Sequence, residues 1–416
     1  MPDRSDQPDP GPLAGLRVID CSTVLAGPYC TMLLGDLGAE VIKVEPPDGD
    51  ATRGWGPPWV GSVEAGTRTA AYFLAVNRNK RALRLDLKRP EGAAILRRLL
   101  ADADVLVENF RGDGFARLGF DDETLRTLNP RLVHLAISGY GTDGPAADRP
   151  GYDFIVQAVS GLMSITGAAD VDGGGPTKVG VAISDILTGM LGAVGLLGAL
   201  AGREREAGPA SGQGQRVDVS ILGATLASLV NQAQNAFVSG AAPGRLGNAH
   251  PNIVPYETFE TADGALAVAV GSERQWPRLC VALGRPELAA DPRFATNGDR
   301  VENRGALRPM LATTFAARTT AAWITALDAA GIPCGPINDI VEAFASPEAV
   351  ALGMSVEQEH PAFGAIRQAG LPFQLSVTPA TIRTSPPTLG EDSDAILGEL
   401  GYAPAEIEAL RGRGVI

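Results

Sequence analysis

The feature that most constrains the fold is a strand–helix alternation that runs through residues 16–138. An apolar run at 16–20 (LRVID) predicts a buried strand, Pro28 suits the first turn of a helix, and residues 40–45 (EVIKVE) predict a second strand. Two strands joined in this way form a parallel pair with a right-handed crossover. The N-terminal part of the chain therefore predicts an α/β fold with a parallel sheet.

The pattern then recurs along the chain. Further strands are predicted at residues 81–87, 105–108, 132–137 and 216–219, and helices at 90–100 and 122–128. Four of the strands should end side by side at one edge of the sheet, near Leu25, Glu45, Asn109 and Ser138. Ligands of open parallel sheets bind at that edge. The first turn, STVLAGP, lacks the glycine-rich dinucleotide fingerprint, which disfavours a Rossmann dehydrogenase.

The charge balance narrows the choice of partners. Lys and Arg number 35 against 48 Asp and Glu, so the formal net charge is −13, which argues against nucleic acid or an anionic membrane. A phosphate-bearing ligand would need a local basic cluster. Six basic residues lie close to the predicted strand ends, and each could hold a phosphate or belong to a solvated face: Arg53, Arg78, Lys80, Arg81, Arg111 and Arg117.

Cysteine and histidine spacing predicts no metal site. The cysteines form no CxxC pair and are expected to be reduced and mostly buried, as in the cytoplasm: Cys21, Cys30, Cys280 and Cys334. The histidines are far apart in sequence: His134, His250 and His360. Residues 1–13 are acidic and proline-rich without the pattern of a signal peptide, which predicts a disordered leader and a cytoplasmic protein.

Residues 182–202 form the longest apolar segment, and their length alone would permit a membrane span. Asp185 lies near the start of this segment, and charged residues follow its end. Four glycines at close spacing indicate a buried helix that approaches its neighbours closely: Gly189, Gly192, Gly195 and Gly198. The segment therefore predicts a buried helix of a soluble protein, without a membrane partner.

The second half of the chain predicts a change of architecture. Residues 222–238 predict a helix with a polar stripe, and the loop at 245–255 marks a domain boundary. Residues 256–270 predict a hairpin that turns at Asp263-Gly264. Residues 331–337 (GIPCGPI) form a second rigid connection.

Residues 151–180 hold the candidate active site. A segment with helical spacing, 154–166, precedes a loop that contains Asp170, Asp172 and the glycines 173–175. A carboxylate beside flexible backbone can act as a nucleophile while nearby N–H groups receive developing negative charge. An ordinary surface turn has the same composition, so both interpretations stand at this point.

Taken together, these motifs resemble family III CoA-transferases, the CaiB/BaiF group of carnitine, bile-acid and formyl-CoA transferases, whose relatives include alpha-methylacyl-CoA racemases. The resemblance covers nearly the whole chain, in order and at compatible spacing. The matching segments are residues 16–20 with Ala26-Gly27-Pro28, 37–45 (LGAEVIKVE), 79–86 (NKRALRLD), 107–110 (VENF), 151–153, 160–167 (SGLMSITG), 178–189 in outline, 214–220 (GQRVDVS), 331–337 and 389–391.

The resemblance implies an α/β fold with a large Rossmann-like, CoA-binding domain. Its parallel sheet would be built from both chain ends, residues 14–225 and 332–416. A smaller central α+β domain would span residues 251–331, after a linker helix and loop at 226–250. The resemblance also implies an interlocked homodimer in which each subunit is a ring threaded by the other.

The family nucleophile is an aspartate three residues after a Thr-Gly pair, and Thr166-Gly167 put Asp170 in that place. Two additional residues, Val171 and Asp172, come before the glycines, so Asp172 is a competitor. Asp170 is favoured because its spacing from the preceding helix is kept.

The resemblance also implies binding positions. Those for CoA are Thr23, Val24, Ala26, Lys80, Asn109, Phe110 and Arg117. Those for the acyl group and acceptor are Leu25, Trp55, Tyr140, Gly173 and Gly174. Formyl-CoA:oxalate transferases have a glutamine in place of Leu25 and a CoA-contacting arginine in place of Pro46, so oxalate is disfavoured as acceptor and the nucleotide contacts should differ.

The implied reaction moves CoA from an acyl-CoA thioester to a carboxylic acid through an aspartyl anhydride and an aspartyl-CoA thioester. CoA is the only cofactor, used as a substrate, with no metal, flavin or nicotinamide. Backbone N–H groups at 173–175 or at 26–27 are candidates to stabilise the oxyanions.

Two alternatives remain. A racemase needs a base and an acid on either side of the α-carbon, but Tyr152 stands where racemases have a histidine. Asp153 and Asp185, the other racemase positions, are then structural residues such as helix caps. A non-catalytic CoA-binding protein is the second alternative, and the retained Lys80, Asn109 and Asp170 argue against it.

Overall fold

The computed structural model describes residues 11–416, and the chain divides into two compact units. The first comprises residues up to 162, 179–233 and 347–416, and the second comprises 163–178 and 234–346. The predicted leader, residues 1–13, lies outside the described residues except for its last three. Of these, Gly11 is buried and the Leu13 N–H donates to the Leu37 carbonyl at 2.9 Å.

Two segments fall in a different unit from the predicted one. The loop at 163–178 belongs to the second unit because Asp170 and Arg245 bind each other there. Residues 332–346 also belong to it, because β11 (Cys334–Pro336) pairs with β10 (Ala265–Ala269).

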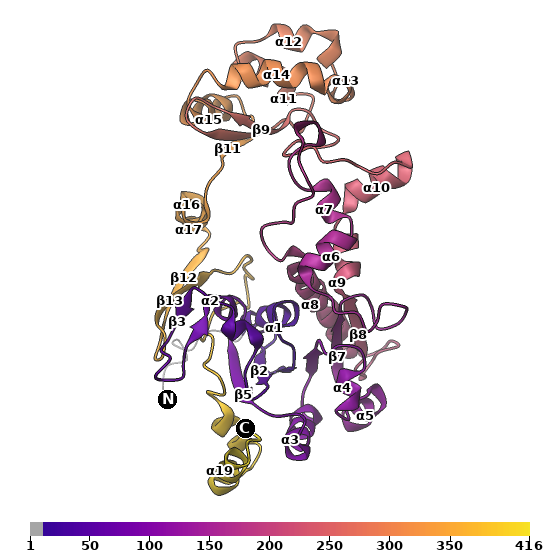
Figure 1. Ribbon diagram of the computed structural model, residues 1–416, viewed down its shortest axis with the longest axis vertical. Helices are drawn as coiled ribbons and strands as arrows, with labels where there is room; N and C mark the ends of the chain where they lie inside the picture. The colour runs from indigo at the N-terminus through magenta and orange to yellow at the C-terminus, as the bar shows by residue number, and fades with distance from the viewer. Residues whose placement is uncertain (1–10) are drawn as a thin grey trace. The chain divides into compact units, whose positions relative to one another are not determined.

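The first unit is organised around a six-stranded sheet with the order β5-β2-β1-β6-β7-β8, parallel throughout (Figure 1). The predicted parallel α/β sheet is confirmed. Its strands are β1 (Arg17–Asp20), β2 (Glu40–Glu45), β5 (Lys80–Arg84), β6 (Val105–Glu108), β7 (Val133–Ser138) and β8 (Arg216–Ser220). All six precede residue 221, so the expectation that both chain ends build the sheet is wrong. The C-terminal end contributes helices instead.

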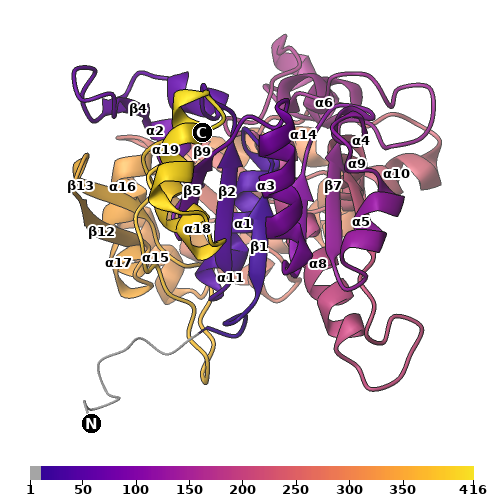
Figure 2. The same ribbon diagram turned by 90° about the horizontal axis from the view of Figure 1, so that it is seen from below.

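Successive side chains of the strands point to opposite faces of the sheet, so each face has its own hydrophobic core. Val18 belongs to one core and Ile19 to the other. One face is covered by α1 (Ala26–Asp36), α8 (Ile183–Arg203) and α9 (Ile221–Ala227). The opposite face is covered by α3 (Pro90–Ala101), α5 (Asp122–Leu128) and the C-terminal helices α18 (Ser393–Glu399) and α19 (Pro404–Gly412) (Figure 2). The sheet is therefore doubly wound.

The strand order changes direction between β1 and β6, because the chain adds β2 and β5 on one side of β1 and β6 to β8 on the other. In doubly wound sheets the crevice beyond the carboxyl ends of such strands is the ligand site. The predicted strand ends near Leu25, Glu45, Asn109 and Ser138 belong to the adjacent strands β1, β2, β6 and β7.

Smaller elements complete the first unit. The helix expected at 154–166 is two helices, α6 (Asp153–Val159) and α7 (Leu162–Ile165), because Gly161 between them has a φ of 87°; all of α7 after Leu162 belongs to the second unit. The remaining elements are β3 (Trp59–Val60) paired with β4 (Thr69–Ala70), β12 (Ser355–His360) paired with β13 (Gly364–Ala369), the short helices α2 (Ala71–Leu74), α4 (Gly114–Arg117) and α17 (Pro347–Ala351), and the 3-10 turn η2 (Ala51–Gly54).

The second unit has an antiparallel sheet in the order β11-β10-β9. The predicted hairpin is confirmed, since β9 (Tyr256–Glu260) pairs with β10. Its core contains Trp276, Phe315 and Trp323. The helices are α10 (Val230–Ser239), which begins in the first unit, α11 (Gln275–Ala282), α12 (Glu287–Ala290), α13 (Asn297–Glu302), α14 (Arg304–Phe315), α15 (Thr320–Ala329) and α16 (Ile340–Ala345), with the 3-10 turns η3 (Asp170–Asp172) and η4 (Pro292–Phe294). The helix predicted at 222–238 breaks between α9 and α10, where Val230 has a φ of 31°.

Helix α8 is the apolar segment that the sequence singled out. By length and composition it is apolar enough to cross a membrane, and half of its most apolar window is buried inside the protein. Gly189 explains why it packs closely on α1, because a Cβ there would lie 2.5 Å from the Ala26 carbonyl oxygen. A Cβ at Gly192 would lie 2.9 Å from Leu135 on β7. The helix is thus fitted to the sheet and to α1 by its glycines.

Candidate functional site

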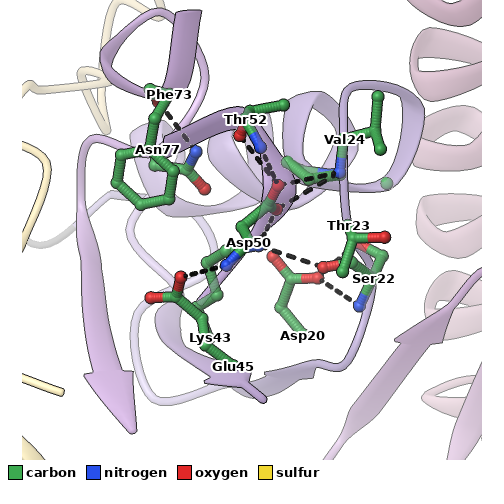
Figure 3. A network of polar contacts seen from close by, with 12 residues as sticks. Asp20, Ser22, Thr23, Val24, Lys43, Glu45, Asp50, Thr52, Phe73 and Asn77 are labelled. Atoms are coloured by element: carbon green, nitrogen blue, oxygen red, sulfur yellow. Dashed lines mark hydrogen bonds and ion pairs between the residues drawn. The ribbon is translucent and has the colours of Figure 1, made fainter. Parts of the chain in front are cut away.

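A buried ion network holds the loop that follows β1 (Figure 3). Lys43 of β2 is completely buried, and its Nζ lies 3.0 Å from Asp50 Oδ2 and donates to the Ser22 carbonyl at 3.0 Å. Asp50 in turn accepts the Val24 N–H at 3.2 Å. Lys43 and Asp50 therefore fix the shape of residues 22–24, where two of the predicted CoA contacts lie.

The network shifts the pKa values of Lys43 and Asp20 in the direction of their charged forms. Burial would lower the pKa of Lys43, but the charges of Asp20, Asp50 and Glu45 outweigh it and raise the pKa. Burial would also raise the pKa of Asp20, but Lys80 and Lys43, with two hydroxyl groups, lower it to about 2. Each buried charge thus has an opposite charge beside it, the condition under which such groups are tolerated.

Lys80 belongs to this network and not to a ligand site, which corrects its predicted role in CoA binding. Its Nζ is buried and donates to Asp20 Oδ2 at 3.1 Å, to the Pro28 carbonyl at 2.8 Å and to Asn77 Oδ1 at 2.9 Å. An ammonium group has three protons, so these contacts leave none for a phosphate. Burial lowers the pKa of Lys80 to about 8, although Asp20 acts in the opposite direction.

A cavity of about 430 Å³ lies at the ends of β1, β6 and β7. The Thr23 N–H donates to Asn109 Oδ1 at 3.0 Å, and Asn109 Nδ2 donates to the Thr23 carbonyl at 2.8 Å, which joins the two loops. Val24 has a φ of 72°, a conformation that a β-branched residue rarely adopts. Six of the predicted positions line this cavity: Thr23, Val24, Leu25, Ala26, Asn109 and Phe110.

The cavity has the groups needed to hold phosphates. It lies at the start of α1, where the first N–H groups have no partner within the helix. Arg111 and Arg149 also line it. Three of the other basic residues form ion pairs with carboxylates and do not line this cavity. The pairs are Arg53 with Glu45, Arg78 with Asp36 and Arg81 with Glu40, each at 2.7 Å.

Besides Lys80, three predicted residues of the first unit lie outside the lining of this cavity. Arg117 is exposed and pairs with Asp113 one helical turn away. Trp55 is exposed at 45% and packs edge-on against Tyr72, with ring centroids 5.3 Å apart. The Tyr140 hydroxyl is buried without a partner among residues 11–416.

Asp185 also lines the cavity, although the sequence assigned it a structural role. Only 8% of the residue is exposed, and its carboxyl group makes no hydrogen bond with the described residues. Burial, and then the charge of Asp153, raise the pKa of Asp185 to about 7. Asp153 itself is structural, because its Oδ1 accepts the Ser184 N–H of α8 at 2.8 Å.

In the second unit, Arg245 holds Asp170 from two sides. The guanidinium Nη2 forms an ion pair with Asp170 Oδ1, and the Arg245 backbone N–H donates to Asp170 Oδ2 at 3.1 Å. About half of the Asp170 side chain is exposed, at 49%. A Cβ at Gly244 would lie 2.8 Å from Asp170 Oδ2, so this glycine makes room for the carboxylate.

The glycines after Asp170 shape the turn. The Gly173 and Gly174 N–H groups donate to the carbonyls of Asp170 and Ala169 at 3.1 and 3.2 Å, so these two predicted oxyanion donors are occupied. Gly173 has a φ of 72°, which a glycine adopts without strain. Asp172 is exposed, and its carboxylate has no ion-pair or hydrogen-bond partner in the described part of the chain. It lines a second cavity, of about 420 Å³.

Sequence reasoning missed Arg245 and Arg149, and it gave Asp185 a part in a site only in the racemase alternative. Lys43 carried a usable signal, because a lysine in the apolar run EVIKVE must find a buried anion. Arg245 stands in a glycine-rich loop 75 residues beyond Asp170, and only the fold brings them together.

We predict that Lys80→Met lowers stability by about 3–5 kcal/mol, because it removes the cation paired with the buried Asp20 and leaves Asp20 and Asp50 to share Lys43. Arg117→Ala is the control, since the exposed pair with Asp113 contributes at most about 1 kcal/mol. Urea unfolding at neutral pH measures both. Equal and small effects of the two substitutions would show that Lys80 is not a structural cation.

Asp185 should make stability depend on pH. A carboxyl group whose pKa is about 7 in the folded protein keeps its proton between pH 4 and 7 while the unfolded chain loses it, so stability falls as pH rises through this range and then levels off. Asp185→Asn should remove this part of the decline and be the more stable protein at pH 8. Urea unfolding between pH 4 and 8 tests this, and parallel curves for the two proteins would contradict it.

The comparisons with known proteins agree with this geometry. Residues 13–393 match the family model described as CoA-transferase family III. The succinate–glutarate CoA-transferase of Agrobacterium fabrum is 46% identical over 94% of this chain and 96% of its own, and the succinyl-CoA:glutarate CoA-transferase of Mus musculus is 39% identical over 99% and 92%. A crystal structure of a CaiB/BaiF family protein from Brucella suis superposes with a TM-score of 0.82 at 41% identity, covering 94% of this chain and 99% of that one. The predicted resemblance is confirmed: the chain belongs to CoA-transferase family III and is a CoA-transferase.

Proposed function

We propose that this CoA-transferase moves CoA between small dicarboxylic acids, with Asp170 as the nucleophile. Two of its relatives are named for succinate or succinyl-CoA and glutarate, which supports this substrate class. The observation that carries the proposal is the position of the Asp170 carboxylate. It is half exposed, it forms an ion pair with Arg245, and it precedes a turn formed by glycines.

The reaction has four steps that conserve atoms and charge. Asp170 attacks the thioester carbonyl, the C–S bond breaks, and CoA leaves as the thiolate. The thiolate then attacks the aspartyl carbonyl of the anhydride and releases the first acid as its carboxylate. A second carboxylate attacks the aspartyl-CoA thioester, giving a new anhydride and CoA thiolate. The thiolate finally attacks the acyl carbonyl, which forms the new acyl-CoA and regenerates Asp170.

Coenzyme A is the substrate that the cavity in the first unit fits. The start of α1 and the two arginines that line the cavity, Arg111 and Arg149, supply N–H groups and positive charge for phosphates. Thr23 and Asn109 supply polar groups at the ends of their strands. Asp185, with its raised pKa, adds a carboxyl group that is protonated below about pH 7 and then donates a hydrogen bond.

A cytoplasmic homodimer is also part of the proposal. Helix α10 has no buried residue, and Val230, Phe237 and Val238 on it are 67%, 78% and 79% exposed. Apolar side chains exposed together in this way are typical of surfaces that a second chain covers. Light scattering at micromolar concentration should therefore give twice the mass of one chain, and a stable folded monomer would contradict the dimer.

The nucleophile is tested by trapping. Succinyl-CoA without an acceptor acid should leave an enzyme–CoA thioester, and hydroxylamine should convert Asp170 to a hydroxamate that mass spectrometry finds in its peptide. Asp170→Asn should still fold and bind CoA, and should lose turnover by roughly three orders of magnitude or more, because an amide is not nucleophilic.

Asp172→Asn is the matched control, and it should keep most of the turnover. A hydroxamate on Asp172 would instead assign the nucleophile to the competitor. Exchange of the α-proton of a branched acyl-CoA, with no trapped adduct, would favour the racemase alternative.

A further inference from the structure

Arg245 is placed so that its anionic partner must change during the reaction. In the free enzyme the guanidinium and the Asp170 carboxylate neutralise each other. When Asp170 becomes an anhydride or a thioester it loses its charge, and Arg245 is left as a cation without its partner. Only 15% of its side chain is exposed, so solvent cannot replace the lost carboxylate.

Backbone carbonyls hold the guanidinium in position independently of Asp170. Arg245 Nη2 donates to the Gly174 carbonyl at 3.0 Å, and Nη1 donates to the Ser164 carbonyl at 3.5 Å. The Nε atom is buried and has no partner within residues 11–416. The cation therefore stays beside the reacting aspartyl group after its charge is lost.

A cavity also borders the two segments that carry this pair. The cavity of about 420 Å³ is lined by Ala169 and Val171, the sequence neighbours of Asp170, and by Leu246, the neighbour of Arg245. Its volume is within the range of small-molecule sites.

We propose that Arg245 binds the reacting carboxylate of the acid substrate whenever Asp170 is in its covalent, uncharged form, and binds Asp170 itself in the free enzyme. This inference rests on the proposed role of Asp170 as nucleophile. The acid is then attracted to the thioester intermediate and not to the free enzyme, where its negative charge would meet an arginine that is already neutralised. Charge alone thus sets the order in which acyl-CoA and acid bind.

The test uses Asp170→Asn. The asparagine amide is about as large as the carboxylate, and it is uncharged, as Asp170 is in the aspartyl-CoA thioester. Calorimetric titration with glutarate should show binding about tenfold or more tighter than to the wild-type enzyme, which corresponds to one charged hydrogen bond. Asp170→Asn combined with Arg245→Gln should lose this gain, and combination with Arg245→Lys should keep part of it. Circular dichroism and CoA binding establish that each variant is folded.

Asp291→Asn is the matched charge control, because it removes one carboxylate of the same unit, paired with Arg293 at 2.7 Å, away from the loop. It should leave glutarate affinity unchanged. Equal affinity of Asp170→Asn and the wild-type enzyme would overturn the inference, and so would a gain that survives Arg245→Gln. These titrations need no turnover, so they are judged separately from the hydroxylamine trapping that tests the nucleophile.

Discussion

Two buried ion pairs, Lys43–Asp50 and Lys80–Asp20, hold together the part of the first unit where the loop after β1 borders the cavity. They join β1, β2, β5 and the loop before η2, and each charge of the two pairs lies beside an opposite one. Removing one member would leave its partner ionised in the interior, which costs several times more than losing an exposed pair. The same contacts hold Val24 in a left-handed conformation, so the stability of the sheet and the shape of the cavity are coupled.

In the second unit the important electrostatic interaction is the ion pair between Asp170 and Arg245. A carboxylate that attacks a thioester must be exposed enough to react and must also be held in one orientation. Arg245 provides the orientation through its backbone N–H and its guanidinium, while half of Asp170 stays accessible. With Asp170 as the proposed nucleophile, the same arrangement would distinguish the free from the covalent enzyme, since only the covalent enzyme would have an uncompensated arginine.

Much of the fold could be predicted because local patterns determine it. The runs LRVID and EVIKVE have the period and length of buried strands, and their positions agree with β1 and β2. The partner of Lys80 could not be predicted in this way. A lysine at a strand end looks the same whether it binds a phosphate or a buried aspartate, and only its distance to Asp20 decides. The break between α9 and α10 at Val230 was also hidden, because backbone conformation at one residue leaves the apolar period intact.

The close approach of α8 to α1 at Gly189 has a consequence for how such an enzyme can change its substrate. Both helices border the cavity, through Ala26 and Asp185, and a single methyl group at Gly189 would collide with the Ala26 carbonyl. A side chain at Gly189 therefore requires one of the two helices to shift. The loops at 109–112 and 147–152 line the same cavity, and loops tolerate changes of length and charge better than a close helix contact does.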